Sequence, residues 1–193
     1  LAPGTPQQAE WQALAQHYGL RTAFEVSWLK ADKRWKRYDF SLQAVRQAGL
    51  WGAEVVYTWL LQAALMGLIA SRTRPVLLEM HGPAEGRLGP WLLRGFMRLK
   101  GARRILPITR ALRDILAKQV RRDFAPGECV LAPNGVDLER FRDLPSPVEA
   151  RRMLGLPSGP TAAYTGHLYA GRGIGLLEKL AQEFPKVNFL WVG

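Results

Sequence analysis

The chain has 193 residues, of which 48% are apolar, so it can form one full globular domain or parts of two. Its longest apolar run, residues 55–70, is shorter than the roughly 20 residues that cross a bilayer, so no transmembrane helix is predicted. The single cysteine, Cys129, excludes an internal disulfide and favours a reducing, cytoplasmic compartment. The formal net charge of +11 predicts attraction to anions.

Apolar strands alternate with helical stretches along most of the chain. The elements predicted first are a strand at 54–58, a helix at 59–71, a strand at 75–80, a helix at 88–100, a strand at 104–108, a helix at 110–120 and a strand at 128–131. Thr109 can cap the last of these helices. The alternation predicts the α/β class, with a Rossmann-like parallel sheet that helices cover on both faces.

Cationic residues gather in the second half of this series. They are Arg94, Arg98, Lys100, Arg103, Arg104, Arg110, Arg113, Lys118, Arg121 and Arg122, with only Asp114 and Asp123 among them. A solvated surface and a contact with an anionic membrane both fit this cluster. Trp91 and Phe96 lie within it and favour the membrane over nucleic acid, for which no binding motif is present.

A turn is predicted at Pro133-Asn134-Gly135, because asparagine and glycine tolerate positive φ. Asp137 can cap the segment that follows, and Phe141 can anchor it in the core. The predicted organisation is a first domain at 1–144, a linker with a short helix at 145–160, and the beginning of a second domain at 161–193. The elements predicted after residue 144 are a helix at 148–154 in the linker, and a strand at 161–165, a helix at 173–184 and a strand at 187–192 in the second domain.

Two places can carry chemistry. His81 follows a predicted strand, at the end where ligands bind in parallel sheets, and Glu79 should point to the same face and can orient the imidazole or pair with an arginine. The loop from Gly166 to Gly173 joins a strand to a helix, whose first N–H groups can hold an anion. Arg172 adds a guanidinium suited to phosphate, although glycines there can also serve only tight packing.

Five motifs together, in their order and spacing, resemble the family 4 glycosyltransferases over about 54–193. They are Glu79-x-His81-Gly82, Ile105-Leu106-Pro107-Ile108-Thr109, Pro133-Asn134-Gly135-Val136-Asp137 with Phe141, Leu154-Gly155-Leu156-Pro157, and Tyr164-Thr165-Gly166-His167-Leu168-Tyr169 with Gly171-Arg172-Gly173. The resemblance implies a GT-B fold of two Rossmann-like domains facing across a cleft. It also implies retaining transfer of a hexosyl group from a UDP- or GDP-sugar to a glycan, lipid-linked or small-molecule acceptor, as in polysaccharide biosynthesis, without an obligatory metal or cofactor.

The resemblance also suggests roles for single residues. His81 matches a histidine beside the donor sugar, with Glu79 next to it, and Gly166 matches the glycine that brings the backbone near the donor. Arg172, before Gly173, stands where the family commonly has a lysine on the diphosphate. His167 replaces a common arginine, and Asn134 and Gly135 are expected on the other side of the donor cleft.

The chain is further expected to be a fragment. It begins without methionine and, compared with the family, lacks the opening strand and glycine-rich loop and most of the second domain with its spaced glutamate pair. The isolated piece is therefore expected to be inactive. An alternative is a non-catalytic basic module that binds an anionic membrane or a partner chain. A nucleotide-sugar epimerase or dehydrogenase is disfavoured because no G-x-G-x-x-G follows a first strand.

Overall fold

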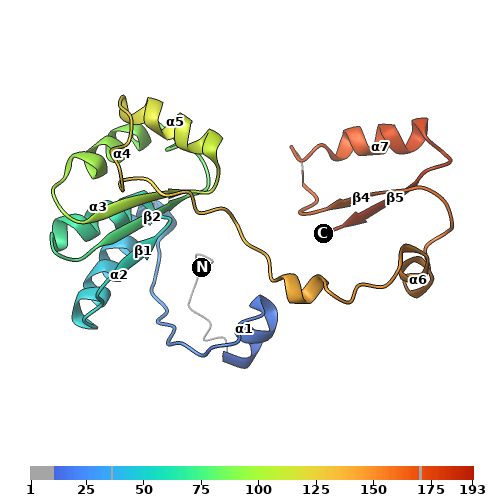
Figure 1. Ribbon diagram of the computed structural model, residues 1–193, viewed down its shortest axis with the longest axis horizontal. Coiled ribbons are helices and arrows are strands. Elements are labelled where there is room, and N and C mark those ends of the chain that lie inside the picture. Colours follow the sequence, from blue (N-terminus) through green and yellow to red (C-terminus); the bar gives the residue numbers. More distant parts are fainter. Residues whose placement is uncertain (1–10, 36, 170) are drawn as a thin grey trace. The chain divides into compact units, whose positions relative to one another are not determined.

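The computed structural model describes residues 11–35, 37–169 and 171–193, and the chain divides into two compact units (Figure 1). Unit 1 ends at Gly135 and unit 2 begins at Val136, whereas the sequence prediction ended the first domain at 144. The described side chains of residues 136–144 are all exposed. This segment therefore packs little against the core of either unit.

Unit 1 is built on a parallel sheet with the strand order β1-β2-β3. Its strands are β1 (Val56–Thr58), β2 (Val76–Met80) and β3 (Arg103–Pro107). The strand predicted at 128–131 lies along β3, where it forms one isolated bridge between Cys129 and Ile105. The Ile105 N–H donates to the Glu128 carbonyl at 2.8 Å, and the Val130 N–H donates to the Ile105 carbonyl at 3.0 Å.

The helical segments of unit 1 are α1 (Trp11–Tyr18), η1 (Lys33–Trp35), α2 (Tyr38–Leu50), α3 (Leu61–Ala70), α4 (Gly89–Arg98) and α5 (Arg110–Val120). Helices α2 to α5 form a row beside the sheet (Figure 1). In sequence order, α2 contacts α3, α3 contacts α4, and α4 contacts α5. Thr109 caps α5 as predicted, its hydroxyl accepting the Leu112 N–H at 3.1 Å.

The core of unit 1 lies between these helices and one face of the sheet. Burial alternates along β2, with Val76, Leu78 and Met80 buried and the residues between them partly exposed. Phe96 of α4 is fully buried in the same cluster. Its expected place at a membrane headgroup layer is therefore wrong, because helical periodicity turns this ring toward the sheet.

Unit 2 contains one strand-helix-strand motif. Its elements are η2 (Leu138–Phe141), α6 (Pro147–Met153), β4 (Thr161–Thr165), α7 (Ile174–Glu183) and β5 (Asn188–Val192), and β4 and β5 are parallel. Asp137 accepts the Glu139 N–H at 3.2 Å and caps η2 as predicted. Phe141, in contrast, is exposed and anchors no core, so that prediction is wrong.

The fold therefore has the predicted α/β class with parallel sheets. Throughout the described residues, no helix combines the length and the apolar character that crossing a membrane requires.

Candidate functional site

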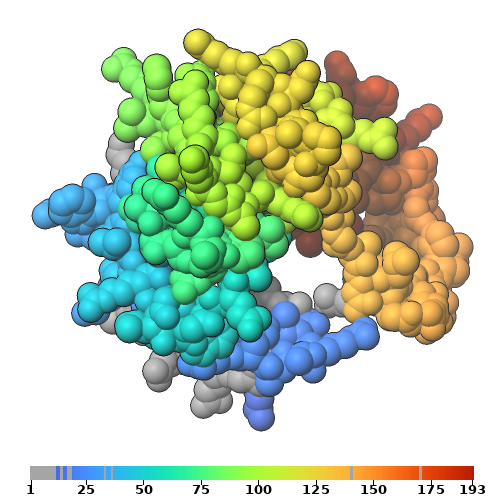
Figure 2. Space-filling model, turned by 60° about the vertical axis from the view of Figure 1, so that its left-hand side comes forward, coloured from blue at the N-terminus to red at the C-terminus, as the bar shows by residue number. Residues whose placement is uncertain are grey.

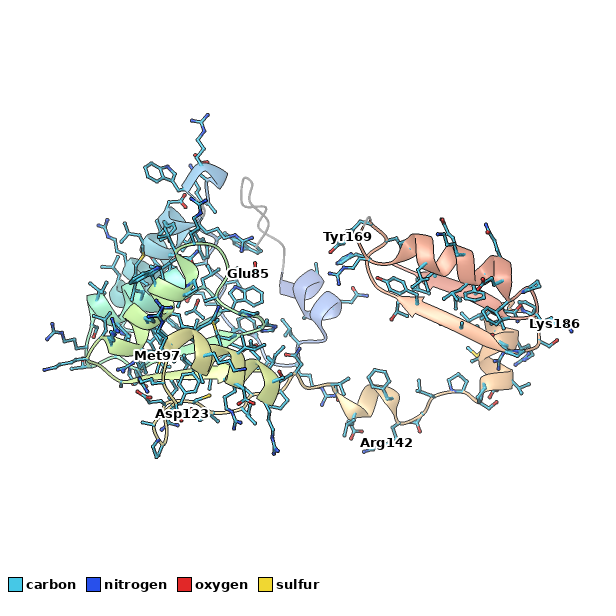
Figure 3. The ribbon with its side chains drawn as sticks, turned by 90° about the horizontal axis from the view of Figure 1, so that it is seen from above. Glu85, Met97, Asp123, Arg142, Tyr169 and Lys186 are labelled. Carbon is cyan, nitrogen blue, oxygen red and sulfur yellow. The ribbon has the colours of Figure 1, made fainter. Side chains whose placement is uncertain are left out.

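A groove of about 1070 Å³ opens in unit 1 at the carboxyl ends of β1 and β2. Its walls come from the turn after β1, the loop 81–88 after β2, and the first residues of α2 and α4. Glu85, labelled in Figure 3, belongs to this loop. Parallel strands direct their carboxyl ends to one edge of the sheet, so side chains from separate segments meet there.

Glu79 and His81 line this groove and form a pair. The carboxylate Oε1 of Glu79 lies 2.5 Å from Nε2 of His81, and the side chains are 19% and 44% exposed. When the carboxylate is ionised and the imidazole neutral, Nε2 carries the proton and Nδ1 can accept a hydrogen bond. The prediction that Glu79 orients the imidazole fits this geometry.

Trp59 also lines the groove and was missed as a site residue in the sequence. Its ring meets the His81 imidazole edge to face, with centroids 6.0 Å apart and planes at 83°. The side chain is largely exposed, although it directly follows β1. The signal in the sequence that could have found it is a tryptophan directly after a predicted strand, at the sheet edge where ligands bind.

The loop after His81 is held at Ala84. The Ala84 N–H donates to Oε1 of Gln119 at 2.9 Å, and Nε2 of Gln119 donates back to the Ala84 carbonyl at 3.0 Å. Gly89 packs so closely that an added Cβ would lie 2.8 Å from the Ala84 carbonyl carbon. These contacts from α5 and α4 keep this wall of the groove in one position.

The glycine-rich loop of unit 2 follows β4, and its residue 170 lies outside the described residues. Gly166 has φ of 144°, and its N–H donates to the Val192 carbonyl at 2.8 Å. An added Cβ would lie 3.2 Å from the Tyr164 hydroxyl oxygen. The positive φ favours glycine at this position, and any other residue would also require the Tyr164 hydroxyl to shift.

Arg172 folds back onto Tyr169 in this loop. Its Nε donates to the Tyr169 hydroxyl at 2.9 Å, its guanidinium lies 5.2 Å from the ring centroid, and the hydrogen bond raises the pKa of Arg172. The ring centroids of His167 and Tyr169 are 6.3 Å apart. Figure 3 shows Tyr169 at one end of unit 2 and Lys186 at the opposite end. His167, Tyr169 and Arg172 form an exposed group of cationic and aromatic side chains. The sequence predicted site roles for His167 and Arg172 but not for Tyr169.

Helix α7 begins directly after this group. Gly173 precedes the helix with φ of 79°, and its carbonyl accepts the N–H groups of Leu176 and Leu177. The first amides of a helix have no acceptor within it, so those of Ile174 and Gly175 are available to an anion.

The predicted turn at Asn134-Gly135 is wrong. Neither residue has positive φ, and both lie exposed in an irregular segment. Pairing of residues 128–132 with β3 continues in an extended form toward Pro133, so no reversal occurs here. The described residues that line the groove of unit 1 include neither of them. Within the described ranges, no group of histidine, cysteine or acidic side chains could hold a metal ion.

Each of the two units is built on a parallel sheet, as in the GT-B fold. A crystal structure of the Anabaena HepE protein in complex with UDP-glucose superimposes with a TM-score of 0.64 at 16% sequence identity. The alignment covers 96% of this chain and 50% of HepE, so the chain spans about half the length of that protein.

The family model of Glycosyltransferase Family 4 matches residues 2–140, and the chain belongs to this family. This match confirms the resemblance seen in the sequence motifs. No curated protein matches the chain significantly.

Proposed function

We propose that the protein transfers a hexosyl group from a UDP- or GDP-sugar to a glycan, lipid-linked or small-molecule acceptor, with retention of anomeric configuration. The observation that carries this proposal is the Glu79–His81 pair in a groove at the carboxyl ends of the sheet. Membership of family 4 and a structural neighbour bound to UDP-glucose support a nucleotide-sugar donor.

The glycine-rich loop of unit 2 is the proposed diphosphate site. During transfer the bond between the anomeric carbon and the diphosphate oxygen breaks, a bond to the acceptor oxygen forms, and the acceptor hydroxyl passes its proton to the departing diphosphate oxygen. Negative charge grows on the leaving diphosphate. Arg172 and the first amides of α7, after Gly173, stabilise that charge, while Gly166 allows close approach of the backbone and His167 adds a donor.

The groove of unit 1 is the proposed sugar-binding surface. Nδ1 of His81 accepts a hydrogen bond from a sugar hydroxyl, and Glu79 keeps the ring in the required tautomer. The exposed ring of Trp59 offers an apolar platform for the carbon–hydrogen face of a sugar. Asn134 and Gly135 have no part in this proposal, since they do not form the turn on which their role depended.

Calorimetric titration with UDP and GDP tests the diphosphate site. Arg172→Ala should weaken binding by about tenfold, because a charge-assisted hydrogen bond to phosphate is lost. Arg152→Ala is the matched control, since Arg152 is an exposed arginine on α6 of the same unit. Equal affinities of the Arg172→Ala variant and the unaltered chain for both nucleotides would refute the phosphate role.

Saturation-transfer NMR with a UDP-hexose tests the sugar surface. His81→Ala and Trp59→Ala should each reduce the signal of hexose protons relative to the base protons. Trp35→Ala provides the control, because Trp35 has the same exposed fraction as Trp59, 65%, but does not line the groove. A hexose signal that survives both substitutions would place sugar recognition elsewhere.

A further inference from the structure

Helix α4 presents a cationic and apolar surface opposite its buried side. Gly89, Leu93, Phe96 and Met97 face the core. Trp91, Arg94 and Arg98, spaced three and four residues apart, occupy the opposite side of the helix, and Leu88 at the helix start extends it. We name Leu88, Trp91, Arg94 and Arg98 the α4 face.

The apolar members of the α4 face are open to solvent. Leu88 and Trp91 are each 66% exposed. The Arg94 guanidinium lies 5.1 Å from the Trp91 ring centroid, and its Nε donates to the Gln119 carbonyl at 2.8 Å. This contact gives the surface a fixed geometry in which a cation and an aromatic ring are presented together.

Charge around the α4 face has one sign over a long stretch. Residues 86–113 contain no acidic residue and eight cations: Arg87, Arg94, Arg98, Lys100, Arg103, Arg104, Arg110 and Arg113. Asp114, the next acid along the chain, is paired with Arg113 at 2.8 Å. In Figure 2, α4 (green) and α5 (yellow-green) form part of the visible surface of unit 1. Glu85, exposed directly before this stretch, adds one negative charge, so the net charge along residues 85–113 stays strongly positive and attracts an anionic surface.

The composition of the α4 face favours a bilayer over nucleic acid. Leu88 is aliphatic and gains nothing from a phosphate backbone, whereas it gains free energy in an acyl layer. One face of the Trp91 ring is covered by Arg94, which leaves less of the ring for stacking with bases. Tryptophan beside arginine is the combination that settles at the headgroup level.

We propose that the α4 face docks unit 1 on an anionic lipid bilayer. Helix α4 lies along the surface, with Trp91 and Leu88 in the interface and Arg94 and Arg98 among the headgroup phosphates. At 10 residues it has half the length of a membrane span. Leu88, Gly89 and Leu92 also line the groove of unit 1, so docking brings that groove close to the lipid. This binding does not depend on the proposed transfer reaction.

Vesicle sedimentation with the full 193-residue chain tests the proposal. The chain should bind vesicles of phosphatidylcholine mixed with phosphatidylglycerol, bind pure phosphatidylcholine much more weakly, and dissociate as salt is added. Arg98→Glu should lower the partition coefficient about tenfold, and Trp91→Ala should lower it severalfold. Arg152→Glu changes net charge equally at an exposed position in unit 2 and should have a much smaller effect.

Two further measurements separate a bilayer from other anions. Brominated lipid should quench a component of tryptophan fluorescence that is missing in Trp91→Phe, a variant that keeps an aromatic ring. Soluble glycerol phosphate should release no more of the chain from vesicles than sodium chloride at the same ionic strength. The proposal is overturned by equal binding to neutral and anionic vesicles, by equal effects of Arg98→Glu and Arg152→Glu, by unchanged quenching in Trp91→Phe, or by greater release with glycerol phosphate than with sodium chloride at that ionic strength.

Discussion

Units 1 and 2 contain the same strand-helix-strand motif but bury it to very different extents. In unit 1, Val76 and Leu78 of β2 are fully buried. In unit 2, no described residue reaches that burial, and Leu176 on α7 is exposed. The difference is the number of packed elements, since neighbouring helices cover the sheet of unit 1 whereas α7 stands alone over β4 and β5 (Figure 1). Local pattern is enough for secondary structure, but a core needs several elements together.

The largest expected effect is on the core of unit 1. Phe96→Ala should lower the free energy of unfolding by about 3–5 kcal/mol, because it leaves a cavity at a fully buried position. Phe184→Ala in unit 2 is the matched change and should have a much smaller effect, since Phe184 is 51% exposed. Native-state hydrogen exchange, read separately in each unit, measures both. Comparable losses would show that unit 2 has a core of its own.

Gln119→Leu should have the next largest effect. It leaves the N–H and carbonyl of the buried Ala84 without their partners, which should destabilise unit 1 by about 2–4 kcal/mol. Gln182→Leu on the exposed side of α7 should change stability by less than about 0.5 kcal/mol. Urea denaturation checks both variants. A small loss with Gln119→Leu would mean that water replaces the side-chain amide.

Gly166→Ala probes the local strain of unit 2. Alanine at φ of 144°, close to the Tyr164 hydroxyl, should destabilise β4 and β5 by about 1–3 kcal/mol. Gly175→Ala within α7 meets open space and should instead stabilise unit 2 by about 0.5–1 kcal/mol. Amide exchange of the two strands distinguishes these opposite changes. Equal exchange rates in the two variants would contradict the expected strain.

Glu128→Gln should have the smallest effect and depend on pH. Arg122 donates to the Glu128 carboxylate at 2.7 and 3.0 Å and lowers its pKa below the ordinary value of 4.5. The substitution should therefore destabilise unit 1 by about 1 kcal/mol at neutral pH. Because the folded-state pKa is lowered, this stabilisation is present above the ordinary pKa and disappears as pH falls through the lowered one.

Denaturation curves at several pH values measure this difference. Glu183→Gln, at an exposed position in unit 2, serves as the control. A difference between the unaltered chain and Glu128→Gln that persists in acid would show that the carboxylate charge is not its source.

The elements from 54 onward could be predicted because their apolar residues are periodic and their ends are marked. Helix α5 matches its prediction from Arg110 to Val120, and β4 matches from Thr161 to Thr165. The sequence reasoning predicted no element before 54, although α2 carries Phe40, Ala44 and Ala48 at helical spacing. That helix begins at Tyr38, and Arg37 before it is a non-glycine residue in left-handed conformation that offers no capping side chain. The sequence therefore lacks the capping residue that would have marked the start of α2, and the helix was not predicted.

The candidate site could be predicted only where one segment contains it. Glu79 and His81 lie two residues apart at the end of one strand. Extended backbone places both side chains on the same face, so their pairing follows from strand geometry. Trp59, Gln119 and Gly89 come from other elements, and their contacts with the site depend on how those elements pack.

Apolar periodicity, caps and short motifs were enough to predict the α/β class, the family, and the positions of β1 to α5 and of α6 to β5. Tertiary structure alone decided which aromatic residues are available to ligands. Phe96 and Trp91 lie five residues apart on one helix, yet packing of α4 against the sheet buries the first and exposes the second. The rotation of a helix about its axis is set by the layer that it covers, and that layer comes from distant parts of the chain.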